Sequence, residues 1–457
     1  MSLTHDQPEA VASHPYAIAD PKRVPAQRYY SADFARLEKE KLWPHVWQVA
    51  CRLEDIPEVG DYIEYEINDQ SILVVRESEP GPGSGPETAS ASGIKAYYNA
   101  CRHRATALGN GSGTFHGRQI VCPYHGWRWD LNGESTYVFA SERGFTPACL
   151  DKDNLRLREV QVGTWGGMVF VNMDPQAPPL EQYLDGIAKV LDPIAFDRMR
   201  VRWWRHVILP CNWKMAQEAF LEAYHVMQAH PSLSMGAADD DYNLEAAVGS
   251  FECFEEGHAH SRPPTSTEAP VKGMSKADYF IQFNNALYFG TDAFTTEREI
   301  FVQQGLLERD IPDEEFIPKF FEALYAHAQG AGIPLPPPVT DTQGYGHIFP
   351  NLTFLPGYGT NIIYRSRPNG DDPESCVFEV WAVQIPGADA GEPERPELEG
   401  PVPVEEWPQI FREDFRNVIG QQKGVRGAGI DDLIMSERYE AMIINNHRTI
   451  DRYLGKD

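Results

Sequence analysis

Hydrophobic and polar positions divide the chain into a strand-rich first part and a mixed remainder. From Trp47 to about Asp174, short runs of β-branched and aromatic residues alternate with Gly, Pro and Asn turns. The clearest runs lie at residues 62–65, 71–75, 95–98 and 168–171. Runs of this length and composition are typical of strands. We therefore predict a small antiparallel β domain, entered through a helix over residues 33–48.

The remainder follows a Pro-rich segment, 175–179, which is the best candidate for a domain boundary. Helices are predicted at 180–190, from about 213, and from about 405 to the end. Strands are predicted at 201–209, 348–355, 360–367 and 377–384. Residues 77–93, rich in Pro, Gly, Ser and Glu, indicate a hairpin loop inside the first domain.

The predicted fold class is therefore α+β, with one small and one large unit. The expected division is an N-terminal arm and entry helix (1–43), the small β domain (44–174) and a larger domain (175–457). The stretch around 232–346 has a mixed pattern, and we interpret it as an insertion in the larger domain.

Composition narrows the class of protein. With 42% hydrophobic residues among 457, global disorder is excluded. The formal net charge of −27 argues against nucleic acid and anionic membranes as partners. The most apolar stretch, Trp165 to Met173, is far shorter than the ~20 residues of a membrane helix. The N-terminus lacks a basic-then-apolar pattern, so we expect a cytoplasmic protein.

Two short clusters each pair one cysteine with one histidine. They are Cys101-Arg102-His103 and Cys122-Pro123-Tyr124-His125, with 18 residues between them. Two Cys and two His can bind zinc, or a [2Fe–2S] cluster in which both His serve one iron. Two unrelated Cys/His pairs on loops are the remaining interpretation. Seven scattered cysteines give little support for a disulfide framework and leave room for metal binding.

A second set of metal-binding side chains lies in the predicted helix over residues 212–231. On an ideal helix His225 and His230 would point about 140° apart and could not bind one ion. Pro231 disfavours helical geometry at His230, so the two rings could converge where the helix ends. Glu222 lies three residues before His225, within reach of a hydrogen bond to it. A helix with two surface or core histidines is the alternative.

A third ligand has to come from another part of the chain. Asp414 falls at helical spacing with the apolar residues Trp407, Phe411 and Val418, whereas Glu413 falls on the polar face. A carboxylate on a buried face is costly unless it is paired or metal-bound. Asp414 is therefore the preferred candidate, with a buried ion pair as the alternative.

Taken together, these motifs resemble those of the catalytic (alpha) subunits of Rieske non-haem iron oxygenases, of the aromatic-ring-hydroxylating type. Cys-x-His and Cys-x-x-His-Gly-Trp resemble the Rieske motif, and Asn-Trp-Lys followed by carboxylate-x-x-His-x4-His resembles the catalytic helix. The family also places its ligand Asp shortly before a Gln-x-Gly, here Gln422-Lys423-Gly424. The resemblance covers nearly the whole chain.

The resemblance implies a fold and two cofactors. The fold would be a Rieske domain followed by a curved antiparallel sheet wrapped by helices, of the helix-grip or START-like type. Cys101 and Cys122 would hold one iron of a [2Fe–2S] cluster, and His103 and His125 the other. A mononuclear Fe(II), which activates O2 as co-substrate, would be bound by the remaining three residues. These are His225, His230 and Asp414.

The resemblance also implies an assembly. Family members commonly form trimers, with or without a beta subunit, and receive electrons from NAD(P)H through a separate reductase, with or without a ferredoxin. Glu222 would bridge His225 to His125 of a neighbouring subunit and carry electron transfer between them. Most aromatic-ring dioxygenases have Asp here, whereas Glu also occurs in relatives acting on quaternary amines. A basic set of side chains near the cluster would suit an acidic redox partner; its members are Arg102, Arg104, Arg118 and Arg128.

The resulting hypothesis is the terminal oxygenase component of a Rieske system, hydroxylating a small hydrophobic, aromatic or polycyclic substrate. Aromatic and aliphatic residues of the insertion could roof an apolar pocket, or each of them could belong to an ordinary core. They are Phe280, Ile281, Phe283, Leu287, Tyr288, Phe289, Phe316, Phe320, Phe321 and Leu324. The alternative is a Rieske monooxygenase or demethylase acting on an N- or O-methyl or quaternary amine substrate. From another class, an electron carrier or a lipid-binding protein with a vestigial cluster remains open.

Overall fold

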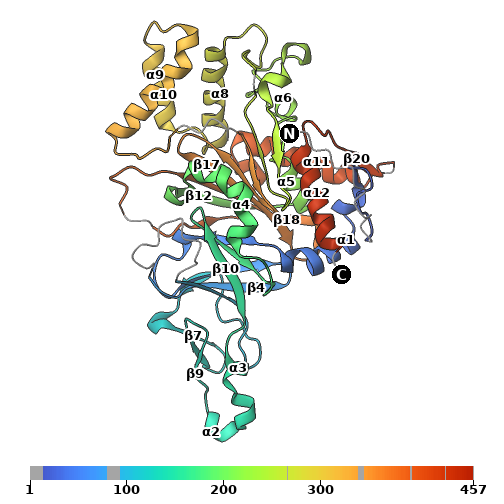
Figure 1. Ribbon diagram of the computed structural model, residues 1–457, viewed down its shortest axis with the longest axis vertical. Helices are drawn as coiled ribbons and strands as arrows, with labels where there is room; N and C mark the ends of the chain where they lie inside the picture. Colours follow the sequence, from blue (N-terminus) through green and yellow to red (C-terminus); the bar gives the residue numbers. More distant parts are fainter. Residues whose placement is uncertain are drawn as a thin grey trace.

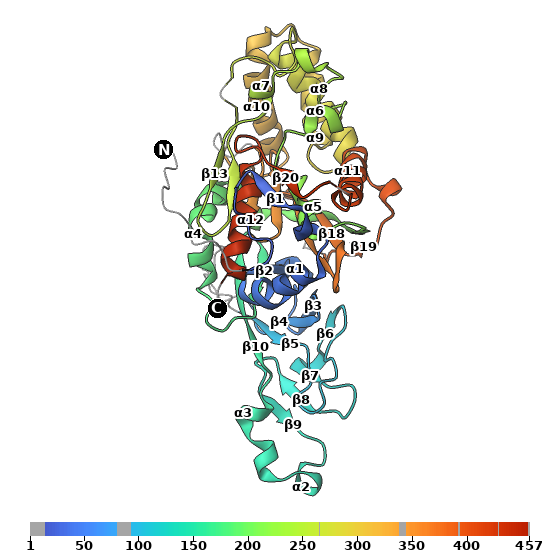
Figure 2. The ribbon, with the colours of Figure 1, turned by 90° about the vertical axis from the view of Figure 1, so that its right-hand side faces the viewer.

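The chain folds into an elongated molecule with a narrow tip at one end and a helical body at the other (Figures 1 and 2). The computed structural model describes residues 14–79, 93–264, 266–337, 344–391, 394–427 and 429–455. Most of the predicted loop over 77–93 and the start of the N-terminal arm lie outside these ranges. No helix in the described ranges is long and apolar enough to cross a lipid bilayer.

The first sheet has seven antiparallel strands in the order β2-β11-β10-β5-β4-β3-β6. Their bounds are β2 (Gln48–Arg52), β3 (Asp61–Ile67), β4 (Gln70–Arg76), β5 (Ile94–Tyr98), β6 (Ser112–Thr114), β10 (Glu159–Trp165) and β11 (Met168–Asn172). All four strand runs predicted for this region are confirmed. A three-stranded sheet forms the tip together with two short helices. It contains β7 (Gln119–Val121), β8 (Arg128–Asp130) and β9 (Ser135–Tyr137).

The second sheet has eight strands in the order β13-β14-β15-β16-β17-β18-β12-β19, all antiparallel except for the β12–β19 pair. Their bounds are β12 (Arg200–Leu209), β13 (Phe251–Cys253), β14 (Ala259–Ser261), β15 (Gly346–Ile348), β16 (Leu352–Pro356), β17 (Thr360–Asn369), β18 (Asp372–Gln384) and β19 (Leu398–Glu399). The single strand predicted over 348–355 is wrong in one respect. It is two strands of a hairpin, because Pro350 lies at the turn and lacks the N–H that a continued ladder needs.

Helices pack around this second sheet. Short α5 lies on β17 and β18, and α11 lies against α5. At the top of Figure 1, α8, α9 and α10 form a separate group. The bounds are α4 (Leu180–Leu191), α5 (Trp213–Glu218), α6 (Val226–Ala229), α8 (Lys276–Thr291), α9 (Glu297–Leu307), α10 (Asp313–Gly330), α11 (Gln409–Val425) and α12 (Ala441–Leu454). The predicted α+β class, a curved antiparallel sheet wrapped by helices, is confirmed.

The entry helix is shorter than predicted. Regular α1 (Ala32–Leu37) continues as a π-helical segment, Glu38–Leu42, and a 3₁₀ turn, Trp43–His45, before β2 begins. Pro44 lacks an N–H and so favours the end of the helix there. Glu38 forms a fully buried ion pair with Lys214 at 2.7 Å, which ties this segment to α5.

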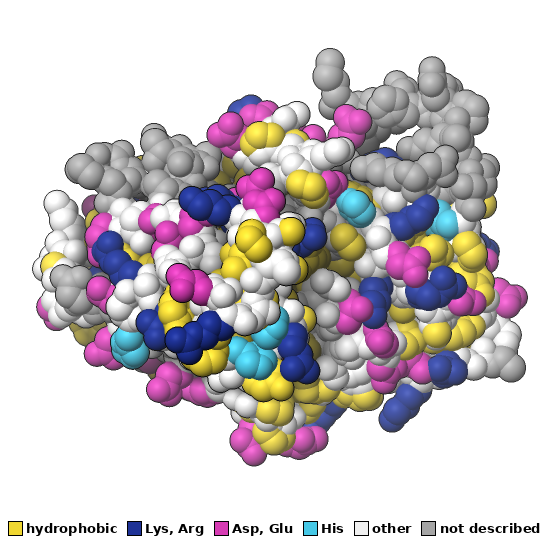
Figure 3. All heavy atoms as spheres, turned by 90° about the horizontal axis from the view of Figure 1, so that it is seen from below, with side chains coloured by type: hydrophobic (Ala, Val, Ile, Leu, Met, Phe, Trp, Pro, Cys, Tyr) yellow, Lys and Arg dark blue, Asp and Glu magenta, His cyan; other side chains and the backbone are white. Residues whose placement is uncertain are grey.

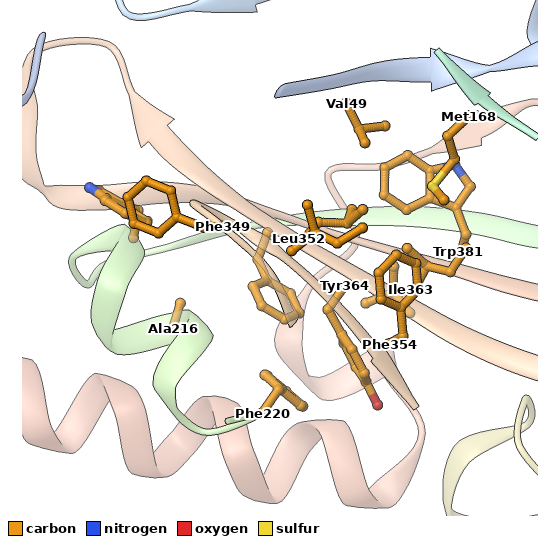
Figure 4. Packing of buried hydrophobic residues seen from close by; sticks show 14 of the residues in the cluster. Val49, Met168, Ala216, Phe220, Phe349, Leu352, Phe354, Ile363, Tyr364 and Trp381 are labelled. Atoms are coloured by element: carbon orange, nitrogen blue, oxygen red, sulfur yellow. The ribbon is translucent and has the colours of Figure 1, made fainter. Parts of the chain in front are cut away.

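One hydrophobic core is shared by the two sheets. Figure 4 shows Val49 and Met168 of the first sheet near Trp381 of the second, within one cluster of buried residues. The tip has a smaller core of its own, which includes the side chains of Cys101 and Cys122. The two units are therefore packed as one body, with the tip projecting from it.

Candidate metal centres

Two loops of the tip bring the first candidate set together. His103 and His125 have ring centroids 4.7 Å apart. Burial raises the pKa of the Cys101 thiol, and the neighbouring thiol of Cys122 raises it further. The sequence-predicted residues of this set therefore form one cluster of side chains.

Both loops are built on the same turn. In each, the cysteine N–H donates to the carbonyl five residues on, Cys101 to Thr106 and Cys122 to Trp127, both at 2.9 Å. In each, the cysteine carbonyl accepts from the N–H four residues on. The residue at that fourth position has positive φ, 59° at Ala105 and 71° at Gly126. The two loops thus present their Cys and His side chains in matching ways.

The environment of these side chains fits a [2Fe–2S] cluster. Both cysteines are buried, whereas both histidines are partly exposed. His103 is stacked on Trp127, with centroids 4.6 Å apart, and its buried Nδ1 has no hydrogen-bond partner among the described residues. A buried nitrogen without a partner is unusual in a native protein and is available as a ligand atom. Two inner thiols with two outer imidazoles are the donor set of a Rieske cluster.

The second candidate set corrects the prediction of one long helix over 212–231. Helix α5 ends at Glu218, and the chain makes a turn before α6 begins after His225. The carboxylate of Glu222 accepts from the backbone N–H of His225 at 3.0 Å, a local hydrogen bond that replaces the helical one. His230 then follows α6 in a non-helical conformation (φ −124°, ψ 79°). The helix break, rather than Pro231 alone, lets the two imidazoles converge.

Three predicted ligands meet at this break. The Nε2 atoms of His225 and His230 lie 3.4 Å and 3.0 Å from the same oxygen, Oδ1 of Asp414 on α11. One ligand atom from each residue lies within 4.8 Å of the others. Asp414 and His230 are buried, and His225 is partly exposed. Two histidines and one carboxylate converging on one point are the donor set of mononuclear non-haem iron.

Each imidazole is oriented by a further carboxylate. His225 Nδ1 lies 2.6 Å from Glu222 Oε1, and His230 Nδ1 lies 2.8 Å from Glu413 Oε2. Sequence reasoning missed Glu413, which helical periodicity had assigned only to the polar face. Its position next to Asp414 was the available signal. Carboxylates in this position fix the ring so that Nε2 faces the metal.

The electrostatics of the site call for a cation. Burial works against a charged His225, but Asp414 and Glu222 offset this effect and raise its pKa to about 10. Burial alone would raise the pKa of Asp414. Hydrogen bonds with His225 and His230 outweigh this effect, so the pKa of Asp414 is lowered overall. The histidines thus retain a proton beside the carboxylates, and a divalent cation would balance the negative charge of those carboxylates in its place. The donors and their charge therefore fit iron.

The insertion does not form the predicted roof as a whole. Most of the ten side chains named for this roof pack with one another in a separate core of α8, α9 and α10, and Phe289 is 79% exposed. Phe283 and Leu287 instead join a small apolar cluster that includes side chains within four residues of each ligand in the sequence. For most of the ten residues the ordinary-core interpretation holds, because their partners lie within the helical group itself.

Fold and sites together define a Rieske-type non-haem iron oxygenase, and comparison with known proteins agrees. The family model "Ring hydroxylating alpha subunit (catalytic domain)" matches residues 196–456, and the model "Rieske [2Fe-2S] domain" matches residues 46–146. The chain belongs to the ring-hydroxylating alpha subunit family. Its cofactors are accordingly a Rieske [2Fe–2S] cluster and a mononuclear iron, and O2 is a co-substrate.

Curated relatives fall into two groups. The carnitine monooxygenase oxygenase subunit of Escherichia coli (strain K12) is 29% identical over 311 residues, covering 61% of this chain and 78% of that protein. The chlorobenzene dioxygenase subunit alpha of Cupriavidus sp. (strain PS12) is 29% identical over 381 residues, covering 80% and 72%. The crystal structure of naphthalene 1,2-dioxygenase from Rhodococcus sp. bound to indole has a similar fold, with a TM-score of 0.62 at 19% identity, covering 94% of each chain.

Proposed function

We propose that this oxygenase subunit hydroxylates a hydrophobic, aromatic or polycyclic substrate at the iron held by His225, His230 and Asp414. We propose equally that Cys101, Cys122, His103 and His125 hold the Rieske cluster. Residues 44–174 would then form the Rieske domain and residues 175–457 the catalytic domain, after an arm and entry helix over 1–43.

The observation that carries the substrate proposal is the apolar cluster beside the three ligands, which we call the apolar cover. Each ligand has a member next to it in sequence: Val226 follows His225, Leu233 lies three residues after His230, and Ile410 lies four before Asp414. The cover is completed by side chains of α8 and of the loop after it. These are Phe283, Ala286, Leu287 and Phe294. An apolar wall around a reactive centre favours an apolar ligand.

The chain's own residues then have distinct tasks. When bound, the iron would supply dioxygen activation, with electrons from the cluster. With iron bound, Glu222 and Glu413 would accept hydrogen bonds from the Nδ1 atoms and hold both imidazoles in the neutral, metal-binding tautomer. The apolar cover excludes water and holds the substrate beside the site.

The assembly we propose is a homotrimer in which electrons pass between subunits, with or without a beta subunit. The tip with the cluster residues and α11 with Asp414 lie in distant parts of one chain (Figures 1 and 2). A cavity of about 850 Å³ opens beside Glu222 and the partly exposed His225. This cavity would receive the tip of a second subunit, with Glu222 between His225 and His125 of that subunit. A separate reductase, with or without a ferredoxin, would supply the electrons.

A complementation experiment tests the assignment of residues and the assembly. Chains with His103→Ala and chains with His225→Ala should each be inactive. After co-expression, mixed trimers should regain a substantial part of the activity, because an intact cluster then faces an intact iron site. If the mixed trimers regained no activity, this result would contradict electron transfer between subunits. Product analysis by mass spectrometry with simple aromatic compounds, fed by a surrogate reductase, tests the substrate class.

A second candidate is a Rieske monooxygenase acting on a quaternary amine or another N- or O-methyl compound. Two observations favour it: Glu rather than Asp stands at position 222, and a carnitine monooxygenase subunit is among the relatives. Release of formaldehyde from a methyl substrate, or exclusive turnover of a trimethylammonium compound, would select this candidate over the first.

A further inference from the structure

Two tyrosines lie on the face of the second sheet that faces α5 and α11. His347 pairs with Thr353, and Thr353 pairs with Tyr364 on the next strand, so these three side chains share one face. Tyr345 lies two residues before His347, and alternation along an extended chain puts it on the same face. Tyr345 and Tyr364 therefore lie on one side of the sheet, with β16 between their strands.

The surroundings of Tyr364 place this face beside the iron site. Its ring is stacked on Phe220 with centroids 4.3 Å apart, and it lies 6.2 Å from the ring of Phe411. Phe220 comes two residues before Glu222, and Phe411 three residues before Asp414. Figure 4 shows the Tyr364 ring beside Phe220, with its hydroxyl directed away from the packed side chains of Ile363 and Trp381.

The hydroxyl of Tyr364 is unusual because it makes no hydrogen bond with any described residue, although the side chain is only 5% exposed. Other buried tyrosines have partners: Tyr29 donates to Glu218, Tyr97 to the Leu131 carbonyl and Tyr183 to the Phe349 carbonyl. The half-buried Tyr345 hydroxyl likewise has no partner in the described part of the chain. Neither oxygen is among the fully buried side-chain atoms without a partner, so both face open space, where the two hydroxyls can donate to one ligand atom.

The charges around these hydroxyls determine what kind of atom they can bind. Burial raises the pKa of Tyr345, and the Asp414 and Glu222 carboxylates raise it further. Burial and Asp414 act in the same direction on the pKa of Tyr364. Both phenols therefore stay protonated and act as hydrogen-bond donors. The same negative charges disfavour an anionic ligand at this position.

We propose that Tyr345 and Tyr364 determine substrate specificity by donating hydrogen bonds to one oxygen of the substrate. The site would select a neutral, apolar ring compound that carries a single acceptor oxygen, such as a ketone or an ether. An unsubstituted hydrocarbon leaves both hydroxyls unpaired, and a quaternary ammonium group offers no acceptor at its nitrogen. This inference rests on the proposed function and specifies its substrate class.

The test uses two tricyclic probes of nearly equal shape, 9-fluorenone with a carbonyl oxygen and fluorene without one. Dissociation constants are measured on the full chain by equilibrium dialysis, so no redox partner is needed. We expect the wild type to prefer fluorenone by about tenfold or more. Tyr345→Phe and Tyr364→Phe should each reduce this preference several-fold, and the double variant should abolish it. The affinity for fluorene should stay unchanged, which a merely structural effect would not produce.

Tyr358→Phe is the matched control, because this tyrosine packs on Phe321 of α10, against the core of the α8, α9 and α10 group. It should leave both dissociation constants unchanged. Equal binding of the two probes by the wild type, or a fluorenone preference that survives in the double variant, would overturn the inference while the proposed function stands. If neither probe binds and a trimethylammonium compound does, the proposed function itself fails.

Discussion

At the scale of single residues, the candidate iron site depends on carboxylates that do not themselves face the metal position. Glu413 fixes His230 through a 2.8 Å hydrogen bond. Replacing it with leucine removes the acceptor, and we expect the affinity for ferrous iron to fall about 10–100-fold. Competition with a coloured chelator measures this affinity. Glu406→Leu, an exposed position close to the start of α11, is the control and should change nothing.

Glu222 differs from Glu413 because it also borders the cavity that would receive a second subunit. In Glu222→Gln the amide oxygen can still accept from His225, so iron and cluster contents should stay near those of the wild type. The charge that would link the two subunits is lost, and reoxidation of the reduced protein by O2 with substrate should slow about 10–100-fold. Stopped-flow absorbance of the cluster measures this rate in a single turnover. An unchanged rate would refute the bridging role.

The residues of the two sites differ in how far the sequence could reveal them. The Cys/His spacings predicted four residues whose side chains the structure brings together. This prediction was possible because each pair of residues is held by a short local turn. Asp414 could be chosen over Glu413 because periodicity distinguishes a buried helix face from a polar one. The partnership of Glu413 with His230 spans 183 residues and has no local signature. Tyr345 and Tyr364 likewise share one face of the sheet only through strand pairing.

At the scale of elements, the strands were predictable and the helix carrying the histidines was not. Strands β4 and β11 are short apolar runs between turn residues, and such runs define their own limits. The break after α5 depends on one side chain, Glu222, binding a backbone N–H three residues on. Good helix formers such as Ala219 and Leu221 hide that competition in the sequence.

A buried ion pair within the second sheet holds an arginine that also contacts the first sheet, and the loss of this pair should be measurable. Arg365 on β17 makes two 2.8 Å hydrogen bonds to Glu379 on β18 and also donates to the Val49 and Ala50 carbonyls of β2. Glu379→Gln leaves the arginine buried without its counter-charge, which should cost about 3–5 kcal/mol. Urea unfolding measures the change. Glu399→Gln, which removes an exposed pair with Arg205, should cost less than about 1 kcal/mol.

Buried histidines should make the protein sensitive to mild acid. Burial lowers the pKa of His258 to about 4 and that of His347 to about 3. His258 is held neutral, because Nε2 donates to the Tyr183 carbonyl and Nδ1 accepts from the Phe349 N–H. The unfolded chain binds protons at these rings below about pH 6.5 and the folded chain does not. The contribution of these histidines to the free energy of unfolding should therefore be largest above pH 6.5 and should decrease as the pH drops towards 4.

The dependence of the free energy of unfolding on pH isolates the contribution of the His258 ring. Each histidine should lower the free energy of unfolding by about 1.4 kcal/mol per pH unit between pH 6 and 5. Urea unfolding at pH 7.5, 6 and 5 should show a shallower slope for His258→Gln than for the wild type. The exposed His116→Gln is the control and should keep the wild-type slope. The window stays above pH 5 because Glu379, with its pKa lowered to about 2, contributes only at lower pH.

At the scale of the whole molecule, long-range pairing decides what the sequence could not reveal. The N-terminal arm pairs as β1 (Arg23–Pro25) with β20 (Asp432–Ile434), more than 400 residues away along the chain. Both strands have three residues, too few to form a pattern. The core shared by the two sheets (Figure 4) likewise shows that the strand-rich first part and the mixed remainder of the chain pack as one body.

The charge distribution of the whole molecule predicts where its redox partner binds. The formal net charge is −27, yet four arginines (102, 104, 118 and 128) lie within four residues of a cluster residue in the sequence, and no ion pair involves any of them in the described part of the chain. Two lie over exposed tyrosines: Arg104 over Tyr124 and Arg128 over Tyr137. Seen from the tip, Lys and Arg side chains adjoin histidines on this face (Figure 3). An acidic ferredoxin or reductase would be attracted here and repelled elsewhere.

Charge reversal should therefore slow reduction by the partner without altering the cluster. In Arg104→Glu/Arg128→Glu we expect the second-order rate of reduction by an acidic ferredoxin to fall about tenfold or more at low salt, and this difference to shrink as salt screens the charges. Stopped-flow bleaching of the cluster measures the rate. Reduction by dithionite should be much less affected. Lys189→Glu on α4 reverses a distant exposed charge and should have little effect. Equal rates of reduction for the double variant and the wild type would place the docking surface elsewhere, because these two charges should act on the rate only through binding of the ferredoxin.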